Sequence, residues 1–215
     1  MTIYGISGLG ADERVFQHLE LSYPIVPIRW IPPMPGESMQ SYVLRLSEQI
    51  REEEFMLIGV SFGGLVAVEL NKILKPKLTI LISSAETKDG LRPAYRLIGK
   101  LGLVRYMPPL LLKPPKALMY WLFGAEHKEL LGAILGSTDI AFAKWAILQL
   151  TSWTNREKIT GLVKIHGTRD KLIPYTADSQ TIAIQDGEHF MIIDRAKEIS
   201  LLLEEKVNMM TGQSS

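Results

Sequence analysis

The residue with the clearest chemical potential is Ser61, which lies in the pattern Gly59-x-Ser61-x-Gly63. The apolar run 55–60 before it predicts a buried strand, and the apolar spacing from residue 65 onward predicts a buried helix. A serine at such a sharp strand-to-helix turn exposes its hydroxyl, while the flanking glycines let neighbouring backbone approach closely. The amides that open the helix would face negative charge forming near Ser61. The pattern predicts a nucleophilic serine, and an ordinary glycine-rich turn is the alternative.

A serine hydroxyl needs a histidine to take its proton and an acid to orient that histidine. Among the four histidines, His189 follows the last expected strand, in a loop that can reach over the carboxyl edge of the sheet toward Ser61. Asp170 follows the preceding strand and lies at the same edge. The chain order Ser61, Asp170, His189 is one in which such a triad occurs. The alternatives are His166 as the base, and Asp186 or Glu86 as the acid.

The oxyanion of a tetrahedral intermediate needs two preorganised hydrogen-bond donors. The backbone N–H of Phe62 is one candidate, because Phe62 opens the helix after Ser61. The other expected donor is the N–H of Leu9, in the glycine-rich turn 7–10 after the first strand. Glycines alone are a weak signal there, because any tight turn uses them, and it is the place of this turn in the chain order that supports the assignment.

Composition narrows the class of protein. The chain has 215 residues, of which 47% are hydrophobic, and a net charge of +1. These values suit one α/β domain and give no indication of nucleic-acid binding. Without cysteine there is no disulfide framework, and we find neither a metal-ligand cluster nor a dinucleotide fingerprint, so we expect no metal and no cofactor. No signal peptide or membrane-spanning run is evident, and we expect a cytoplasmic monomer or homodimer.

Alternating strand and helix patterns predict an α/β fold with a mostly parallel sheet of about six strands, covered by helices on both faces. Functional sites in such sheets form at the carboxyl ends of the strands. The expected strands are residues 2–7, 25–30, 55–60, 77–83, 162–166 and 180–185. The expected helices outside the insertion described next are residues 11–19, 39–51, the segment after Ser61, and 190–209.

Residues 86–155 interrupt the alternation and are interpreted as a helical cap inserted into a single domain of residues 1–215. Its helix candidates are residues 91–103, 115–123, 128–135 and 139–150. The apolar run 119–123 indicates either core packing or a lid over an apolar substrate pocket. The candidates to line that pocket are Trp30, Met34, Phe62, Trp121 and Trp145.

The cap segment is also basic. Six cations and no acid lie between residues 91 and 120, which indicates a solvated face or a patch for anionic substrates or an anionic lipid surface. The cations are Arg92, Arg96, Lys100, Arg105, Lys113 and Lys116.

Outside the cap, the sequence resembles the α/β-hydrolase fold superfamily. The pattern around Ser61 matches its nucleophile elbow, residues 166–174 (His-Gly-Thr-Arg-Asp-x-x-Ile-Pro) match its acid loop, and residues 187–190 (Gly-x-His-Phe) match its histidine loop. The chain departs from the family in beginning at what is usually the third strand. Ser7-Gly8 also stands where many members have His-Gly, which removes a side chain that often orders the oxyanion turn. The short interval from Asp170 to His189 predicts only about one helical turn, near residues 175–179.

The resemblance implies a serine hydrolase that cleaves a carboxylic ester or thioester of a small or medium apolar acyl group through an acyl-enzyme. Ser61 would be the nucleophile, His189 the base and Asp170 the acid that orients it, with the amides of Phe62 and Leu9 holding the oxyanion. The partner is then a small molecule. The superfamily also includes C–C hydrolases and lyases with the same triad, and non-catalytic ligand-binding members, and both alternatives remain open.

Overall fold

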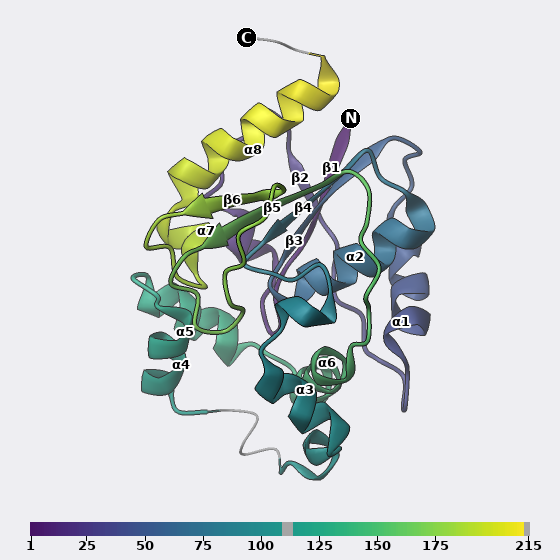
Figure 1. The fold of residues 1–215 in the computed structure, drawn as a ribbon, viewed down its shortest axis with the longest axis vertical. Coiled ribbons are helices and arrows are strands. Elements are labelled where there is room, and N and C mark those ends of the chain that lie inside the picture. Colours follow the sequence, from purple (N-terminus) through teal and green to yellow (C-terminus); the bar gives the residue numbers. More distant parts are fainter. Residues whose placement is uncertain (109–113, 213–215) are drawn as a thin grey trace.

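The computed structural model describes residues 1–108 and 114–212. Its centre is one sheet of six strands in the order β2-β1-β3-β4-β5-β6, and every neighbouring pair is parallel (Figure 1). The predicted fold class is therefore confirmed. The strands are β1 (Thr2–Ile6), β2 (Ile25–Pro27), β3 (Phe55–Val60), β4 (Leu78–Ile82), β5 (Leu162–Gly167) and β6 (Thr181–Ile184).

Helices cover both faces of the sheet and fill the interval between β4 and β5 (Figure 1). The main layers contain α1 (Met39–Leu46), α2 (Phe62–Leu74), α7 (Met191–Asp194) and α8 (Ala196–Thr211), with the 3₁₀ turns η1 (Glu13–Phe16) and η2 (Ser47–Gln49). The cap segment, residues 86–155, contains η3 (Lys88–Gly90), α3 (Pro93–Lys100), η4 (Leu103–Tyr106), α4 (Lys116–Phe123), α5 (Lys128–Gly136) and α6 (Ile140–Ser152).

The strand order places a topological switch between β1 and β3. From β1 the chain moves to β2 on one side, and then returns to add β3 to the other side. The connections that leave the carboxyl ends of β1 and β3 therefore run in opposite directions and leave a crevice between them, which is where parallel sheets bind ligands. The glycine-rich turn at residues 7–10 and Ser61 lie at these two strand ends. The fold thus brings together the two segments expected to hold the oxyanion and the nucleophile.

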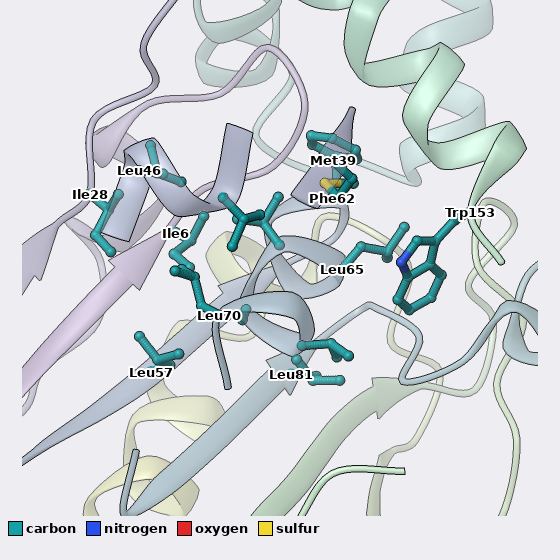
Figure 2. Packing of buried hydrophobic residues seen from close by; sticks show 14 of the residues in the cluster. Ile6, Ile28, Met39, Leu46, Leu57, Phe62, Leu65, Leu70, Leu81 and Trp153 are labelled. Carbon is teal, nitrogen blue, oxygen red and sulfur yellow. The ribbon is translucent and has the colours of Figure 1, made fainter. Parts of the chain in front are cut away.

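Two apolar clusters pack against the sheet. Side chains alternate along β3, so that Phe55 and Leu57 belong to one cluster while Met56 and Ile58 belong to the other. Figure 2 shows part of the first cluster, in which Leu65 and Leu70 of α2 pack with residues of the neighbouring strands and α1. This burial on both faces explains why β3 is a continuous apolar run, and it fixes the strand that ends at Ser61.

Three local predictions were wrong. Residues 11–19 form only the 3₁₀ turn η1, which Asp12 caps by accepting the Arg14 N–H; just Val15 and Phe16 of this turn are buried, so little apolar packing supports a longer helix. Residues 175–179 contain no helix. The expected helix 190–209 is broken at Arg195, because Met191, Ile192 and Ile193 are buried consecutively, and α8 needs another direction to pack its stripe of Ile199, Leu203 and Val207.

Among the described residues, no single helix is long and apolar enough to cross a membrane. Taken together, α5 and α6 have the length and apolar composition of a membrane-spanning segment, but the pair bends by 102°.

Tyr42 joins α1 to the cap segment and should make folding sensitive to alkali. Its ring lies 4.1 Å from that of Trp145, and its hydroxyl donates to the carbonyl of Ile31 (2.8 Å). Burial raises the pKa of Tyr42 to about 12, so its contribution to stability is complete below the ordinary tyrosine pKa of about 10 and is lost as pH rises toward 12. Urea unfolding across this window should show a weaker alkaline loss for Tyr42→Phe than for the wild type, and an equal loss would contradict this assignment.

Candidate active site

The turn between β3 and α2 holds Ser61 in a strained conformation. Its φ of 53° and ψ of −121° lie outside the regions that L-residues favour. A Cβ at Gly59 would lie 2.6 Å from the Cα of Gly64, and one at Gly63 would lie 2.2 Å from the carbonyl oxygen of Ser7. The prediction that these two positions lie against neighbouring backbone is therefore confirmed. The backbone also fixes Ser61 through its own N–H, which donates to the carbonyl of Ile82 (3.0 Å).

The three residues expected to form a triad lie in one hydrogen-bonded line. His189 Nε2 is 2.8 Å from Ser61 Oγ, and His189 Nδ1 is 2.7 Å from Asp170 Oδ2. The imidazole of His189 and the carboxylate of Asp170 are both buried, whereas Ser61 is partly exposed. With Nδ1 donating to the carboxylate, Nε2 is left to accept a proton from the serine hydroxyl, which is the tautomer that a general base requires.

The surroundings of Asp170 keep it ionised and fixed. Its Oδ1 accepts the backbone N–H groups of Leu172 (2.8 Å) and Ile173 (2.9 Å). Burial raises the pKa of Asp170, but the electrostatic interaction with His189 and the hydrogen bonds from His166 and His189 lower it more, and they hold it well below its usual value. A permanent carboxylate at this position can stabilise the imidazolium that forms when His189 takes a proton.

The alternative bases and acids make other contacts. His166 is buried beside Asp170, with Nε2 at 2.9 Å from the carbonyl oxygen of Ile173 and 3.4 Å from Asp170 Oδ2. Both contacts are to the acid loop, so His166 helps to hold that loop in place. Asp186 is exposed and pairs with Arg169 (2.9 Å). The other two histidines are His18, which is exposed, and His127, which pairs with Asp194. The other alternative acid, Glu86, accepts the N–H of Ile159.

The expected oxyanion donors lie on either side of Ser61. Phe62 is the first residue of α2, where backbone N–H groups have no partner within the helix. Leu9 borders the same cavity as Ser61, and a Cβ on the preceding Gly8 would lie 3.4 Å from that of Ser61. Both segments therefore lie close to Ser61.

Ser7 anchors the glycine-rich turn at residues 7–10, which was expected to hold the oxyanion. Its hydroxyl donates to the carbonyl of Ala11 (2.8 Å) and accepts the indole N–H of Trp30 (2.9 Å). From the cap segment, the hydroxyl of Thr138 also donates to the carbonyl of Gly10 (3.0 Å). Trp30, predicted to line the pocket, instead holds this turn. The spacing of the motif could not reveal this contact, because Trp30 reaches Ser7 from the connection after β2.

Ser7→Ala should lower kcat for ester hydrolysis about tenfold with little change in KM. The variant removes both hydrogen bonds that the Ser7 hydroxyl makes at the turn and leaves the one from Thr138, and loss of a complete oxyanion donor costs roughly 10²–10³ in rate. Trp30→Phe, which keeps the ring but removes the N–H donor, should have a smaller effect in the same direction. Steady-state kinetics on a soluble ester test this, and an unchanged kcat in Ser7→Ala would contradict the assigned role.

The cap segment contacts the histidine loop directly. The carbonyl of Phe123 accepts the backbone N–H of Phe190 (3.0 Å), and the Phe123 ring meets the imidazole of His189 edge to face at 5.2 Å. Next to them, the ammonium of Lys171 lies 2.5 and 2.6 Å from the two carboxylate oxygens of Glu188, which joins the acid loop to the histidine loop. His189 is thus contacted by both the acid loop and the cap segment.

A cavity of about 330 Å³ opens beside Ser61 and His189. It lies between the sheet edge and the cap segment, and its walls are almost entirely apolar. Phe62 lines it, as predicted, and so do groups of cap residues at helical spacing. These groups are Met119, Leu122 and Phe123 from α4, and Ile147, Leu150 and Thr151 from α6.

Four of the five predicted lining residues are not part of this cavity. Trp30 holds the oxyanion turn, and Met34 is exposed. Trp121 is also exposed, away from the cavity that Leu122 and Phe123 line, with its ring 5.6 Å from the Lys171 ammonium. Trp145 is buried, but its indole N–H donates to the carbonyl of Glu37 (2.8 Å). Among the described residues, no group of three or more His, Asp or Glu side chains could hold a metal ion.

No protein-family model and no curated protein sequence matches the chain. Solved structures do. An esterase from Exiguobacterium antarcticum superposes with a TM-score of 0.75 at 15% identity, over 97% of this chain and 92% of that one. A thermophilic esterase from Thermogutta terrifontis gives a TM-score of 0.75 at 15% identity, over 98% and 90% of the two chains. A meta-cleavage product hydrolase from Pseudomonas fluorescens gives 0.68 at 16% identity, over 97% and 91%.

These similarities extend along nearly the whole chain. The sequence identities are too low to transfer an activity from one protein to another, but the superpositions show the architecture. The chain has the α/β-hydrolase fold.

Proposed function

We propose that this protein is a serine hydrolase that cleaves a carboxylic ester or thioester of a small or medium apolar acyl group. The observation that carries the proposal is the line of hydrogen bonds from Ser61 through His189 to Asp170, at 2.8 and 2.7 Å, beside an apolar cavity. The similarity to solved esterases and to a meta-cleavage product hydrolase supports a hydrolase.

Acylation begins when Ser61 Oγ attacks the carbonyl carbon of the substrate and its proton passes to His189 Nε2. The carbonyl oxygen becomes an oxyanion, which accepts hydrogen bonds from the backbone N–H groups of Phe62 and Leu9. Asp170 stabilises the imidazolium. The bond to the leaving group then breaks, and His189 gives its proton to the departing alcohol or thiol, which leaves an acyl group on Ser61.

Deacylation repeats these steps with water. His189 takes a proton from the attacking water, a second oxyanion forms in the same place, and the proton returns to Ser61 Oγ as the carboxylic acid leaves. The same base serves both half-reactions, so one imidazole held by Asp170 on one side and by the Phe123 ring on the other is sufficient.

The cavity determines the acyl group. Its volume of about 330 Å³ lies at the small end of the range for ligand pockets. Each methylene transferred from water into such an apolar space contributes about 0.8 kcal/mol, or roughly fourfold in kcat/KM, until the cavity is full. We therefore expect kcat/KM for p-nitrophenyl esters to rise from acetate to a medium-chain ester and then to level off or fall.

A pair of variants on α3 tests the placement of the acyl chain. Ile98 lines the cavity from α3, whereas its neighbour Leu97 is exposed. Ile98→Trp should move the optimum to shorter esters because it fills the space, and Leu97→Trp should leave the chain-length profile unchanged. Identical profiles in both variants would place the acyl group elsewhere. Absence of turnover across esters and thioesters by folded wild-type protein would contradict the hydrolase itself.

A further inference from the structure

The turn from α3 to η4 exposes large apolar side chains at the end of the molecule opposite α8 (Figure 1). We call this surface the cap patch. Its apolar members are about half exposed or more, and the side chain of Tyr106 is 81% exposed. Several exposed apolar side chains within one short segment of this kind indicate an interaction site. The cap patch consists of Leu97, Lys100, Leu101, Leu103, Arg105 and Tyr106.

The other face of the same segment lines the cavity beside Ser61, through Tyr95, Ile98, Val104 and Met107. The segment therefore carries apolar side chains on both sides, one set against the cavity and the other against the exterior, where Lys100 and Arg105 lie among them. Here α3 packs inward on α6, while Leu97 on its outer side and Leu101 just after it are left exposed.

Charge distinguishes between the possible partners of the cap patch. The exposed Lys100 and Arg105 lie among its leucines, and from residue 90 to residue 125 the sequence has no Asp or Glu. In a symmetric dimer built on this patch, cations would lie against cations, which disfavours a second copy of the chain. A membrane with anionic lipids complements both features, because leucines enter its interface, Tyr106 suits the headgroup level and the cations attract the lipid charge.

The neighbouring cations are engaged in contacts of their own. Arg96 pairs with Asp89 (2.9 Å), and the guanidinium of Arg92 donates to the carbonyls of Leu172 (3.2 Å) and Asp170 (3.4 Å). Lys113, which the sequence placed in the same basic group, lies outside the described residues. Lys100 and Arg105 are thus the cations that a docking test should change.

We propose that the cap patch docks the protein peripherally on a membrane surface that contains anionic lipids. Docking places the segment that walls the cavity against the lipid. The proposal does not depend on catalysis, since neither Lys100 nor Arg105 contacts the triad, and it is tested without any substrate.

Vesicle flotation tests the proposal with full-length protein. Wild-type protein should float with vesicles of phosphatidylcholine containing about one-third phosphatidylglycerol, and bind pure phosphatidylcholine vesicles far more weakly. Changing both Lys100→Gln and Arg105→Gln should weaken binding about 30-fold, at roughly fivefold for each charge. Leu101→Ser combined with Leu103→Ser should weaken it about tenfold or more.

Leu201→Ser is the matched control, because Leu201 is 75% exposed on α8 at the other end of the molecule. It should bind vesicles as the wild type does, and so should Ser61→Ala. Equal flotation with both vesicle types, or unchanged binding of the Lys100/Arg105 double variant, would overturn the proposal. A wild-type dimer in light scattering that the leucine variant abolishes, without vesicle binding, would assign the patch to a second copy of the chain instead.

Discussion

Replacing Ser61 by alanine is expected to lower kcat for ester hydrolysis by roughly 10⁴-fold or more. The hydroxyl is the only group of this side chain that touches the base, with Oγ at 2.8 Å from His189 Nε2, and an alanine offers no nucleophile in its place. His189→Ala should cost a similar factor because the serine proton then has no acceptor. Asp170→Asn should also cost about 10⁴-fold, since it favours the wrong tautomer of His189.

These losses should not add, because the three residues act as one unit, and a double variant should be about as slow as the slower single variant. Stopped assays with purified, folded protein measure them. Ser41→Ala, which changes an exposed serine on α1, is the matched control and should keep wild-type kinetics. Retention of most activity by any of the three triad variants would remove the corresponding residue from the mechanism.

Gly63→Ala is expected to lower the free energy of unfolding by about 3 kcal/mol or more. The added Cβ would lie 2.2 Å from the carbonyl oxygen of Ser7 and 2.4 Å from that of Ile6, and both are backbone atoms at the end of β1. The higher helix propensity of alanine, about 1 kcal/mol, cannot compensate for this clash. Because relief requires α2 and the oxyanion turn to separate, kcat should also fall in whatever protein remains folded.

Gly136→Ala provides the comparison. Gly136 is the last residue of α5, and no heavy atom outside its own surroundings lies within 4 Å of the position a Cβ would occupy. This variant should be as stable as the wild type or slightly more stable. Urea unfolding midpoints measure the difference, and equal midpoints for Gly63→Ala and Gly136→Ala would show that the close approach at the nucleophile turn is not required.

The parts of the fold that could be predicted from the sequence are those in which local pattern and burial agree. The strand before Ser61 was predicted with its observed bounds, because Phe55–Val60 is buried on both faces and therefore apolar throughout. The segment at residues 11–19 was predicted as a helix and forms a short 3₁₀ turn, since only Val15 and Phe16 of that turn are buried and helices in proteins depend on such packing. Sequence pattern does not report how much of a helix the rest of the fold will cover.

The candidate site also has residues that could be predicted from the sequence and residues that could not. Ser61, Asp170 and His189 could be selected because each follows a strand and the carboxyl ends of parallel strands meet at one edge. The residues that line the cavity could not be selected in this way, because residues 119–123 are apolar without interruption and the sequence does not tell which side of α4 faces inward. Leu122 and Phe123 face the cavity, while Trp121 faces solvent. Rotation of a cap helix is set by its packing against other elements, which no local pattern contains.

The central claim is that Ser61 is an activated nucleophile, and intact-mass labelling with a broad fluorophosphonate tests it most directly. The probe is attacked at phosphorus by a serine oxygen and loses fluoride, so it requires an assembled nucleophile and base but no knowledge of the substrate. We expect one adduct on the wild type and none on Ser61→Ala. Absence of an adduct on folded wild-type protein, or the same adduct on Ser61→Ala, would contradict the account.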